Sequence, residues 1–428
     1  MTPLDFLDLV YQHIGVALFL CATLILVYLL MFRSGISSVA DPLFVGVLAS
    51  AFSAAVVAIL VYLEEIKLFY FTSFFITEIA FLISVLWGGA NCIRLKKLTP
   101  DVAKNSQYLV FHYLLTAAFL LSTSLYLWRV GLPVFQTTSR LITFQELGVL
   151  TWVLDVTWVG VPLSVLIKRH FLNKKSVFDY FLLVFSFFLF ATKGGKSDIV
   201  YILFALHIFS QVTDSVLVKR IESILLMALP VLLLAITSVV LSTWGVETSA
   251  LQVVLERFLL FGDVFFMGYN DSFIATVPDI GFFSYFFGGT MSTIDAIFGN
   301  VASERFILGY AISDFYYGSG EGIGPNARHN ILGLILWGPT FAVIFSALCG
   351  ATFRMCRMRV IGGGKSLFSI FFYCLVNVYA WFFFIDPALA LGYLLKILVV
   401  VPPLAGSAYL LCSWSSLTNN SVGERVNS

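Results

Sequence analysis

The chain has 428 residues, of which 60% are hydrophobic and only 11% are charged. A soluble domain carries about 25% charged residues, so this chain has too little polar surface for a water-soluble fold. The net charge of +1 gives no reason to expect a nucleic-acid partner. Its apolar runs are continuous rather than alternating, which favours membrane helices over a β-barrel. We therefore expect residues 1–428 to form a single all-α polytopic integral membrane domain.

The N-terminal residues Met1–His13 contain no Lys or Arg. A secretory signal peptide has a basic start and a small-residue cleavage site, so the first apolar run should be a retained span. The six cysteines are scattered without metal-ligand spacing and read as small apolar residues. We expect neither a metal site nor a disulfide framework.

Apolar runs of about 20 residues predict eleven membrane spans. In chain order they are 14–32, 42–62, 68–90, 108–128, 147–167, 177–191, 198–216, 221–242, 330–350, 367–385 and 389–412. Alternating the loops between two sides places about twice as many Lys and Arg residues on one side, including Arg94, Lys96, Lys97 and Lys104. The positive-inside rule makes that side cytoplasmic. The N-terminus is then outside and the C-terminus inside.

One outer loop, residues 243–328, is far longer than the others. It contains an apolar stretch at 250–267 and a second one at Phe282–Phe287. Such stretches predict short interfacial or re-entrant helices that lie against the membrane. The glycine-rich part that follows Tyr316 predicts an irregular, adaptable segment.

Cations on the outer side fall into three segments. They are Arg129 to Arg140, the turn Lys193-Gly194-Gly195-Lys196-Ser197, and the long loop with Arg257, Arg305 and Arg328. Arg offers forked hydrogen bonds and Lys a mobile charge, which suits a pyrophosphate. The glycines would let backbone N–H groups approach the same anion at a helix start. The alternative is a set of headgroup-level cations that only anchor the spans.

His329-Asn330 is the sharpest local feature, placed where the long loop enters a span. A neutral imidazole can accept a proton from a sugar hydroxyl or donate to a phosphate. Alternatively, Asn330 is an N-cap and His329 only satisfies the helix end. The loop is also rich in acids and tyrosines, such as Tyr316, Tyr317 and Glu321, which suit sugar binding or a plain solvated surface.

Several ionisable residues fall inside the predicted spans, namely Glu78, Asp155, His207, Asp214 and Lys396. Charged groups in a membrane are costly and therefore mark candidate functional positions. Glu78 and Asp155 could form a proton relay, which would indicate a transporter. Because no cluster of them is evident in the sequence, structural pairing is the preferred interpretation.

These segments together resemble the O-antigen polymerase family, Wzy. The resemblance rests on Asp41-Pro42-Leu43-Phe44, on Arg129-Val130-Gly131-Leu132-Pro133-Val134-Phe135 with Arg140, on Lys193–Ser197, on Arg257 with Gly262-Asp263, and on His329-Asn330. It covers the whole chain in order, although the motifs are short. Lys196 stands where the family usually has Arg, and eleven spans are fewer than many members have.

The resemblance implies a GT-C-type membrane glycosyltransferase of the bacterial inner membrane, with its active face and the 243–328 loop in the periplasm. It would transfer a growing glycan from undecaprenyl pyrophosphate to a lipid-linked repeat unit. Membrane lipids and a chain-length regulator would be its other partners. Protein cations can stabilise such a leaving group, so neither a metal nor another cofactor is expected.

Roles follow for individual residues. We assign Lys196, Arg257 and Arg328 to pyrophosphate, with Lys193 and Arg140 as secondary candidates. His329 would activate or orient the acceptor hydroxyl, and Asp263 would support Arg257 or act as an alternative base. The glycan-binding candidates, listed together, are Tyr316, Tyr317, Glu321 and Asn330. A related O-antigen ligase, which uses a similar signature, and a lipid-linked oligosaccharide flippase or transporter are the alternative functions.

Overall fold

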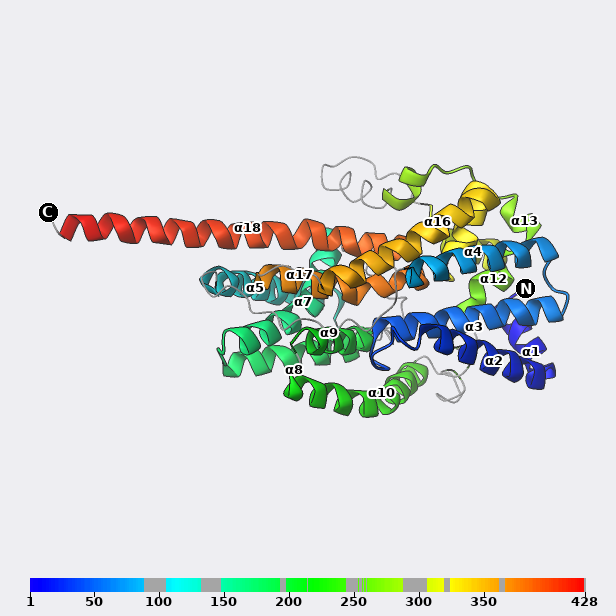
Figure 1. The fold of residues 1–428 in the computed structure, drawn as a ribbon, viewed down its shortest axis with the longest axis horizontal. Coiled ribbons are helices and arrows are strands. Elements are labelled where there is room, and N and C mark those ends of the chain that lie inside the picture. Colours follow the sequence, from blue (N-terminus) through cyan, green and yellow to red (C-terminus); the bar gives the residue numbers. More distant parts are fainter. Residues whose placement is uncertain are drawn as a thin grey trace.

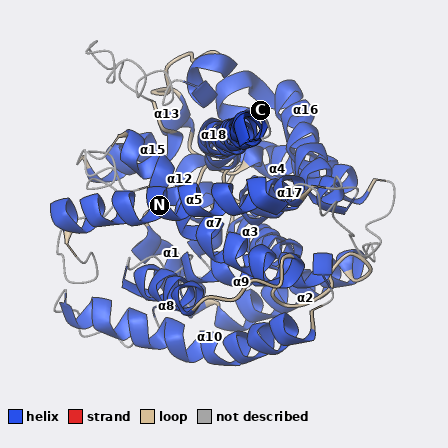
Figure 2. Cartoon of the chain, turned by 90° about the vertical axis from the view of Figure 1, so that its left-hand side faces the viewer, coloured by secondary structure: helices blue, strands red, loops and turns tan. Residues whose placement is uncertain are grey.

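The chain is an all-α polytopic membrane protein. The computed structural model describes residues 1–87, 105–131, 148–192, 198–213, 215–243, 253, 256, 258, 260–287, 306–318, 324–361 and 366–426. Within these residues the regular elements are helices, without strands (Figure 2). Most helices run along one long axis, and the N- and C-termini lie at opposite ends of it (Figure 1).

Every predicted span corresponds to a helix. The long helices are α2 (Ile14–Phe32), α3 (Pro42–Tyr62), α4 (Leu68–Leu86), α5 (Asn105–Val130), α7 (Val149–Phe171), α8 (Val177–Thr192), α9 (Asp198–Thr213), α10 (Val216–Thr243), α16 (His329–Ile361), α17 (Leu367–Ala380) with the 3-10 turn η4 (Trp381–Phe384), and α18 (Pro387–Val426). Among the described residues, eight are long and apolar enough to cross a membrane: α2, α3, α4, α5, α7, α16, α17 with η4, and α18. α8 and α9 are shorter apolar helices.

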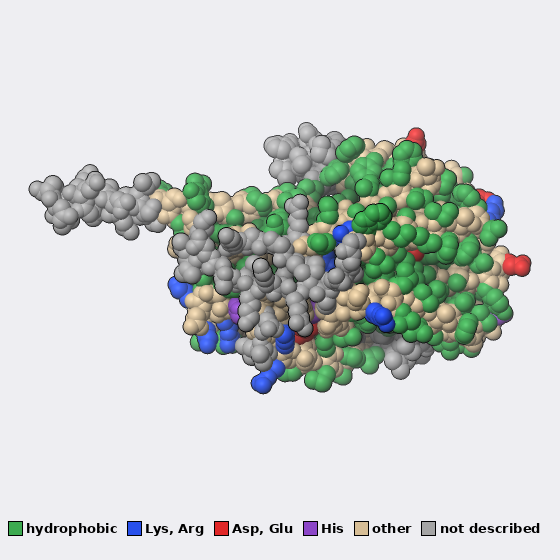
Figure 3. All heavy atoms as spheres, viewed as in Figure 1, with side chains coloured by type: hydrophobic (Ala, Val, Ile, Leu, Met, Phe, Trp, Pro, Cys, Tyr) green, Lys and Arg blue, Asp and Glu red, His purple; other side chains and the backbone are tan. Residues whose placement is uncertain are grey.

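The surface of the bundle fits a membrane. Large apolar side chains are exposed along the long helices, for example Phe19 at 69% on α2 and Leu121 at 66% on α5. On the face seen in Figure 3, hydrophobic side chains cover much of the right-hand part of the bundle. In water such a surface would be a large aggregation liability, whereas lipid solvates it.

The long 243–328 segment is folded against one end of this bundle. Its described elements are η3 (Leu260–Gly262), α12 (Asp263–Gly268), α13 (Asp271–Ile274), a helical stretch at 282–287 and α15 (Leu308–Tyr317). Val264, Phe265 and Phe266 of α12 are buried, and the Phe266 ring stacks on Phe6 of α1 (Pro3–Gln12). Short helices are thus present within the apolar stretches of this segment, and they pack against the bundle; their placement against the membrane stays a prediction.

Part of this segment enters the bundle rather than resting on its surface. The Ser53 hydroxyl of α3 donates to the Phe261 carbonyl at 2.9 Å, and Gly262 lies so close to Val56 that a Cβ there would come within 2.6 Å of it. Ser53 lies about 14 Å along α3 from its Tyr62 end at a rise of ~1.5 Å per residue. The η3–α12 segment is therefore re-entrant.

α16 is a helical hairpin, not the single straight span that the prediction of 330–350 assumed. Gly338 has φ 79° and ψ 175°, a conformation open essentially to glycine alone. The pairs His329–Ser346 and Gly333–Ala342 are in contact, and both are centred on the bond between residues 337 and 338. In a straight helix His329 and Ser346 would be roughly 25 Å apart. The chain therefore enters the bundle, turns back at Gly338, and crosses the membrane in the second arm of the hairpin.

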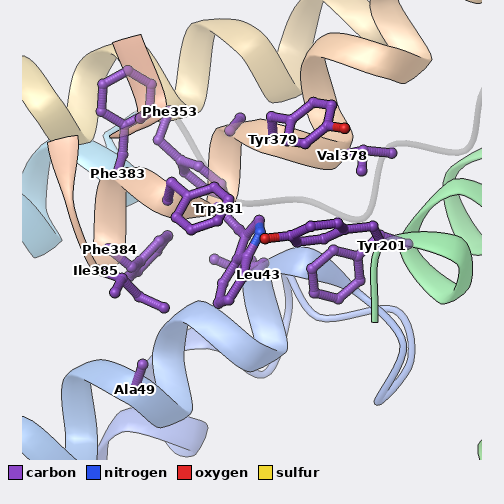
Figure 4. Close-up of a cluster of buried hydrophobic side chains, with 14 of the residues drawn as sticks. Leu43, Ala49, Tyr201, Phe353, Val378, Tyr379, Trp381, Phe383, Phe384 and Ile385 are labelled. Atoms are coloured by element: carbon purple, nitrogen blue, oxygen red, sulfur yellow. The ribbon is translucent and has the colours of Figure 1, made fainter. Parts of the chain in front are cut away.

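The segment η4 fills the middle of the bundle with aromatic rings. Phe384 presses on Gly46 of α3, where an added Cβ would come within 2.6 Å of the ring. Trp381 packs on Phe204 of α9, with ring centroids 5.5 Å apart. Figure 4 shows Trp381 and Phe384 in one cluster of buried side chains with Leu43 of α3 and Tyr201 of α9. Close packing between α3 and η4 thus requires a glycine at position 46.

Segments predicted to share a side of the membrane do contact one another. At one end, Arg357 of α16 donates to both carboxylate oxygens of Asp41, at 2.6 and 2.8 Å, and to the Gly35 carbonyl. At the other end, Lys67 pairs with Asp271 of the long segment, and the N-terminal amine contacts Tyr316 at 3.2 Å. These three contacts are consistent with the predicted grouping of the segments that they join.

The ion pair between Asp41 and Arg357 predicts an acid-sensitive contribution to stability. Burial raises the pKa of Asp41, but Arg357 outweighs it and holds the pKa at about 2. A depressed carboxyl pKa stabilises the fold above the unfolded value near 3.8, and this contribution is lost as pH falls toward 2. Asp41→Asn keeps the N-cap of α3 and is expected to cost about 2 kcal/mol at neutral pH. Thermal unfolding in detergent should show the gap between variant and wild type closing between pH 4 and pH 2, and a constant gap would contradict the assignment.

Candidate functional site

The segment Arg328-His329-Asn330 lies at the centre of the bundle. Because α16 doubles back at Gly338, His329 reaches the level of Ser346, about 10 Å along the second arm from its start. Arg328, His329 and Asn330 are 1%, 0% and 0% exposed. Three consecutive polar residues are thus buried at membrane depth, where each needs partners from other helices.

Arg328 is bound to α3. Its guanidinium donates to the Ala49 carbonyl at 2.9 Å, to the Ser50 hydroxyl at 2.8 Å, and to the Ser53 hydroxyl. The small residues of this α3 face let the guanidinium approach the backbone closely. The Nε atom is buried without a hydrogen-bond partner. In this arrangement Arg328 faces the bundle interior, and it could reach a phosphate only by leaving α3.

Asn330 does not cap its own helix, so the alternative in which it is an N-cap is wrong. Its side-chain amide donates to the Thr77 hydroxyl at 3.1 Å and to Glu78 Oε2 at 3.0 Å, both on α4. Its Oδ1 atom is buried without a hydrogen-bond partner, so it accepts from no backbone N–H of α16. The Asn330 side chain is directed into the bundle instead.

His329 lies between Ser346 and Glu78. Its Nδ1 is 3.0 Å from the Ser346 hydroxyl, and its Nε2 is 3.6 Å from Glu78 Oε2. The ring stacks on Phe81, with centroids 4.2 Å apart and planes 15° apart. A neutral imidazole is most favourably oriented with Nε2–H toward the carboxylate and Nδ1 accepting from Ser346. Phe81 and Ser346 therefore fix the ring in a plane that presents Nε2 to Glu78.

Glu78 is the acid at this centre. Besides Asn330, its carboxylate accepts the Tyr28 hydroxyl at 3.1 Å, and it acts electrostatically on Arg328. Tyr269 of the long segment is also close, since burial and Glu78 together raise the pKa of its phenol well above the usual value. Tyr269 thus remains a neutral donor, and its hydroxyl is buried without a partner. We name Tyr28, Glu78, Tyr269 and Arg328–Asn330 the buried polar centre.

The buried polar centre is closed in this conformation, yet its hydrogen-bonding capacity is not exhausted. Among the described residues, no hydrogen-bond partner is found for Arg328 Nε, His329 Nε2, Asn330 Oδ1 or the Tyr269 hydroxyl. Buried polar atoms are normally satisfied, so four such atoms in one place favour a site for a hydroxyl-rich ligand. They include both donors and acceptors, which is the pattern that sugar hydroxyls require.

The long segment covers this centre. Ile331 packs against Gly268 of α12, where a Cβ would come within 2.5 Å of it. Gly309 of α15 meets the backbone of Gly324 and Pro325, so closely that no Cβ fits at either glycine. These contacts fix α12 and α15 on the residues that lead into Arg328. Access to the centre therefore requires this cover to move.

The remaining predicted site residues lie farther out or outside the described residues. Tyr316 donates to the Met267 carbonyl at 2.9 Å and accepts from Asn270, so it holds α12 and α15 together. Tyr317 is 52% exposed and lies near Asp263, which begins α12. Arg140, Lys193, Lys196, Arg257 and Glu321 fall outside the described residues, so their proposed roles remain predictions.

The ionisable residues inside the predicted spans differ in their surroundings. The preferred interpretation of structural pairing is confirmed for Asp155, which accepts from Lys396 at 2.8 Å. Glu78, by contrast, belongs to the buried polar centre, which the sequence analysis missed. The sequence does carry a signal for this centre. Small and polar residues lie on one face of two otherwise apolar helices, namely Ala49, Ser50 and Ser53 on one and Ser73, Thr77 and Glu78 on the other.

No protein-family model, curated protein or solved structure matches this chain. The family resemblance therefore rests on the short motifs, and the buried polar centre is the structural basis for any chemistry.

Proposed function

We propose that this protein is a GT-C-type membrane glycosyltransferase that polymerises oligosaccharide repeat units carried on a lipid pyrophosphate, as an O-antigen polymerase does. The observation that carries the proposal is the buried polar centre. It combines a histidine, a carboxylate, an arginine and an amide at membrane depth, under a re-entrant cover. A lipid-linked sugar has to be bound by a membrane protein close to the membrane, since its carrier cannot leave the membrane.

The chemistry would be displacement at an anomeric carbon. The acceptor hydroxyl oxygen bonds to that carbon, the bond from the carbon to the pyrophosphate oxygen breaks, and the hydroxyl proton passes to Glu78 or His329. Lipid pyrophosphate leaves with the electron pair. Glu78 already accepts hydroxyl and amide donors at 3.0–3.1 Å, which is the geometry a general base needs.

The leaving group would be stabilised by cations. Arg140, Lys193, Lys196 and Arg257 are the candidates from the sequence, with Lys196 and Arg257 preferred. Arg328 offsets the negative charge of Glu78 in the closed arrangement, and would join the leaving group only if the cover and α3 moved. The proposal places the enzyme in the bacterial inner membrane, with this end of the bundle in the periplasm.

A deletion strain complemented with plasmid-borne protein tests this function. If the chain is a polymerase, its loss should leave lipid A core bearing a single repeat unit, and wild-type protein should restore long chains. Bare core with lipid-linked polymer retained would indicate a ligase instead. Accumulation of repeat units facing the cytoplasm would indicate a flippase. Either of those two phenotypes would overturn the proposal.

A further inference from the structure

A second set of polar residues lies at the other end of α16, where Arg357 contacts the loop between α2 and α3. Ser37 in this loop is 2.8 Å from His207 Nε2, measured from its hydroxyl oxygen. His207 Nδ1 is in turn 2.8 Å from Glu222 Oε1. Arg357 lies about 16 Å along the helix from Ser346, so these residues are separate from the buried polar centre.

The hydrogen-bonded series Ser37–His207–Glu222 has the order of a serine–histidine–acid triad. Glu222 accepts at Nδ1 of His207, which makes that nitrogen an N–H donor and leaves Nε2 facing the Ser37 oxygen. Glu222 is itself held by Ser210 at 3.1 Å and Ser38 at 3.2 Å. His207 and Glu222 are buried at 3% and 7% exposure. The base and its orienting acid are therefore rigidly placed.

Asp41 completes the surroundings of Ser37. Its Oδ2 accepts from the Ser37 hydroxyl at 2.9 Å and from the Ser37 N–H at 3.1 Å, and it lies 3.9 Å from His207 Nε2. The hydroxyl proton therefore points at Asp41 and reaches His207 Nε2 by a rotation about the Ser37 C–O bond. Burial raises the pKa of Asp41, but the Arg357 guanidinium holds it at about 2. Asp41 therefore stays ionised and cannot keep the serine proton. It orients the hydroxyl, and His207 is the group able to take the proton.

The serine is accessible from the membrane surface. Ser37 is exposed, unlike His207 and Glu222 behind it. It lies between the ends of two candidate spans, α2 and α3. Val39 beside it is 54% exposed, and Leu30 and Met31 on the last turns of α2 are 54% and 44% exposed. An acyl chain from the surrounding lipid could lie along these side chains with its ester beside Ser37.

We propose that Ser37, His207 and Glu222 form a nucleophilic site for acyl esters of membrane lipids, independent of the proposed glycan polymerisation. Ser37 Oγ attacks the ester carbonyl while its proton moves to His207 Nε2, and Glu222 stabilises the imidazolium. The alcohol leaves with that proton, and the acyl group remains on Ser37. Water, or another alcohol, then releases the acyl group by the same proton route and restores the serine.

The test is covalent labelling of the full-length protein in nanodiscs with a fluorophosphonate probe, followed by mass spectrometry of the adduct. The wild type should carry the adduct on Ser37, and Ser37→Ala should lose it. His207→Ala should label about 10²- to 10⁴-fold more slowly, the usual contribution of a general base. Glu222→Gln, which preserves shape, should also be slower. Hydrolysis of p-nitrophenyl octanoate should fall in the same order.

Ser34, an exposed serine in the same loop, supplies the matched control. Ser34→Ala should label like the wild type. Two results would overturn the proposal and leave a purely structural network. One is an adduct on residues other than Ser37, and the other is an unchanged rate of Ser37 labelling in His207→Ala and Glu222→Gln. Folding of each variant is checked by its gel-filtration profile. The wild-type adduct site is informative even if a variant fails to fold. Chain elongation should be unaffected in Ser37→Ala, which separates this site from the polymerase proposal.

Discussion

Replacing Arg328 by alanine is expected to lower the free energy of unfolding by about 3–5 kcal/mol, the usual cost of removing one partner from a buried charged network. Arg328 is 1% exposed and donates to three α3 acceptors. Its loss leaves those acceptors unpaired and Glu78 without the compensating charge. Thermal unfolding in detergent measures the effect.

Three comparisons sharpen this experiment. Arg33→Ala removes an exposed arginine and should change stability by less than about 0.5 kcal/mol. Arg328→Lys keeps the charge but cannot form the same fork, so it should be intermediate. Combining Arg328→Ala with Glu78→Gln should cost less than the sum of the single changes, because each removes the other's need for a counter-charge. Equal melting temperatures for Arg328→Ala and Arg33→Ala would show that the network does not hold α3 to α16.

Replacing His329 by alanine is expected to slow glycan elongation about 10²- to 10⁴-fold, if His329 or the Glu78 that it orients handles the acceptor proton. Glu78→Gln keeps the hydrogen-bonded shape around Asn330 and Tyr28 but removes the carboxylate. It should therefore match His329→Ala in lost rate. Elongation is measured with purified protein and a lipid-linked repeat unit, per amount of folded enzyme.

His112 provides the matched control for this loss. It is also buried, at 1% exposure, and bonded to a serine hydroxyl, Ser164 at 2.9 Å, but it lies in the α5–α7–α8 cluster with Lys168 and Asp179. His112→Ala should disturb packing to a similar degree while leaving the rate per folded molecule nearly unchanged. If both histidine variants lose the same activity, the effect is structural. If His329→Ala retains full elongation, the assignment of the centre is wrong.

The glycosyltransferase proposal and the ester proposal fail separately. The first depends on the buried polar centre, at the level of Ser346 in the second arm of α16, and the second on Ser37, near Arg357 of the same arm. Loss of elongation with normal labelling, or the reverse, would identify which of the two sites is functional.

The sequence by itself determined the class of protein and the positions of its helices. Continuous apolar runs leave a helix as the stable form in lipid, and terminators are local, so α2 and α3 lie at the predicted 14–32 and 42–62. Asp41 and Pro42 mark the start of α3 through a cap and a fixed φ, both of which are local signals. The distribution of Lys and Arg predicts which loops share a side, and the contacts of Arg357 with Asp41 and of Lys67 with Asp271 agree with that grouping.

Only the tertiary structure decided which polar residues meet. Glu78 and Asn330 are 252 positions apart, and Ser37 and His207 are 170 apart, so no local pattern relates them. The sequence predicts that Arg328 binds a phosphate, but in the folded chain its guanidinium donates to the Ala49 carbonyl and the Ser50 hydroxyl of α3. The reversal at Gly338 depends on a positive φ that the sequence permits without requiring. Placement of these side chains follows from satisfying buried polar groups across helices, which is a property of the assembled bundle.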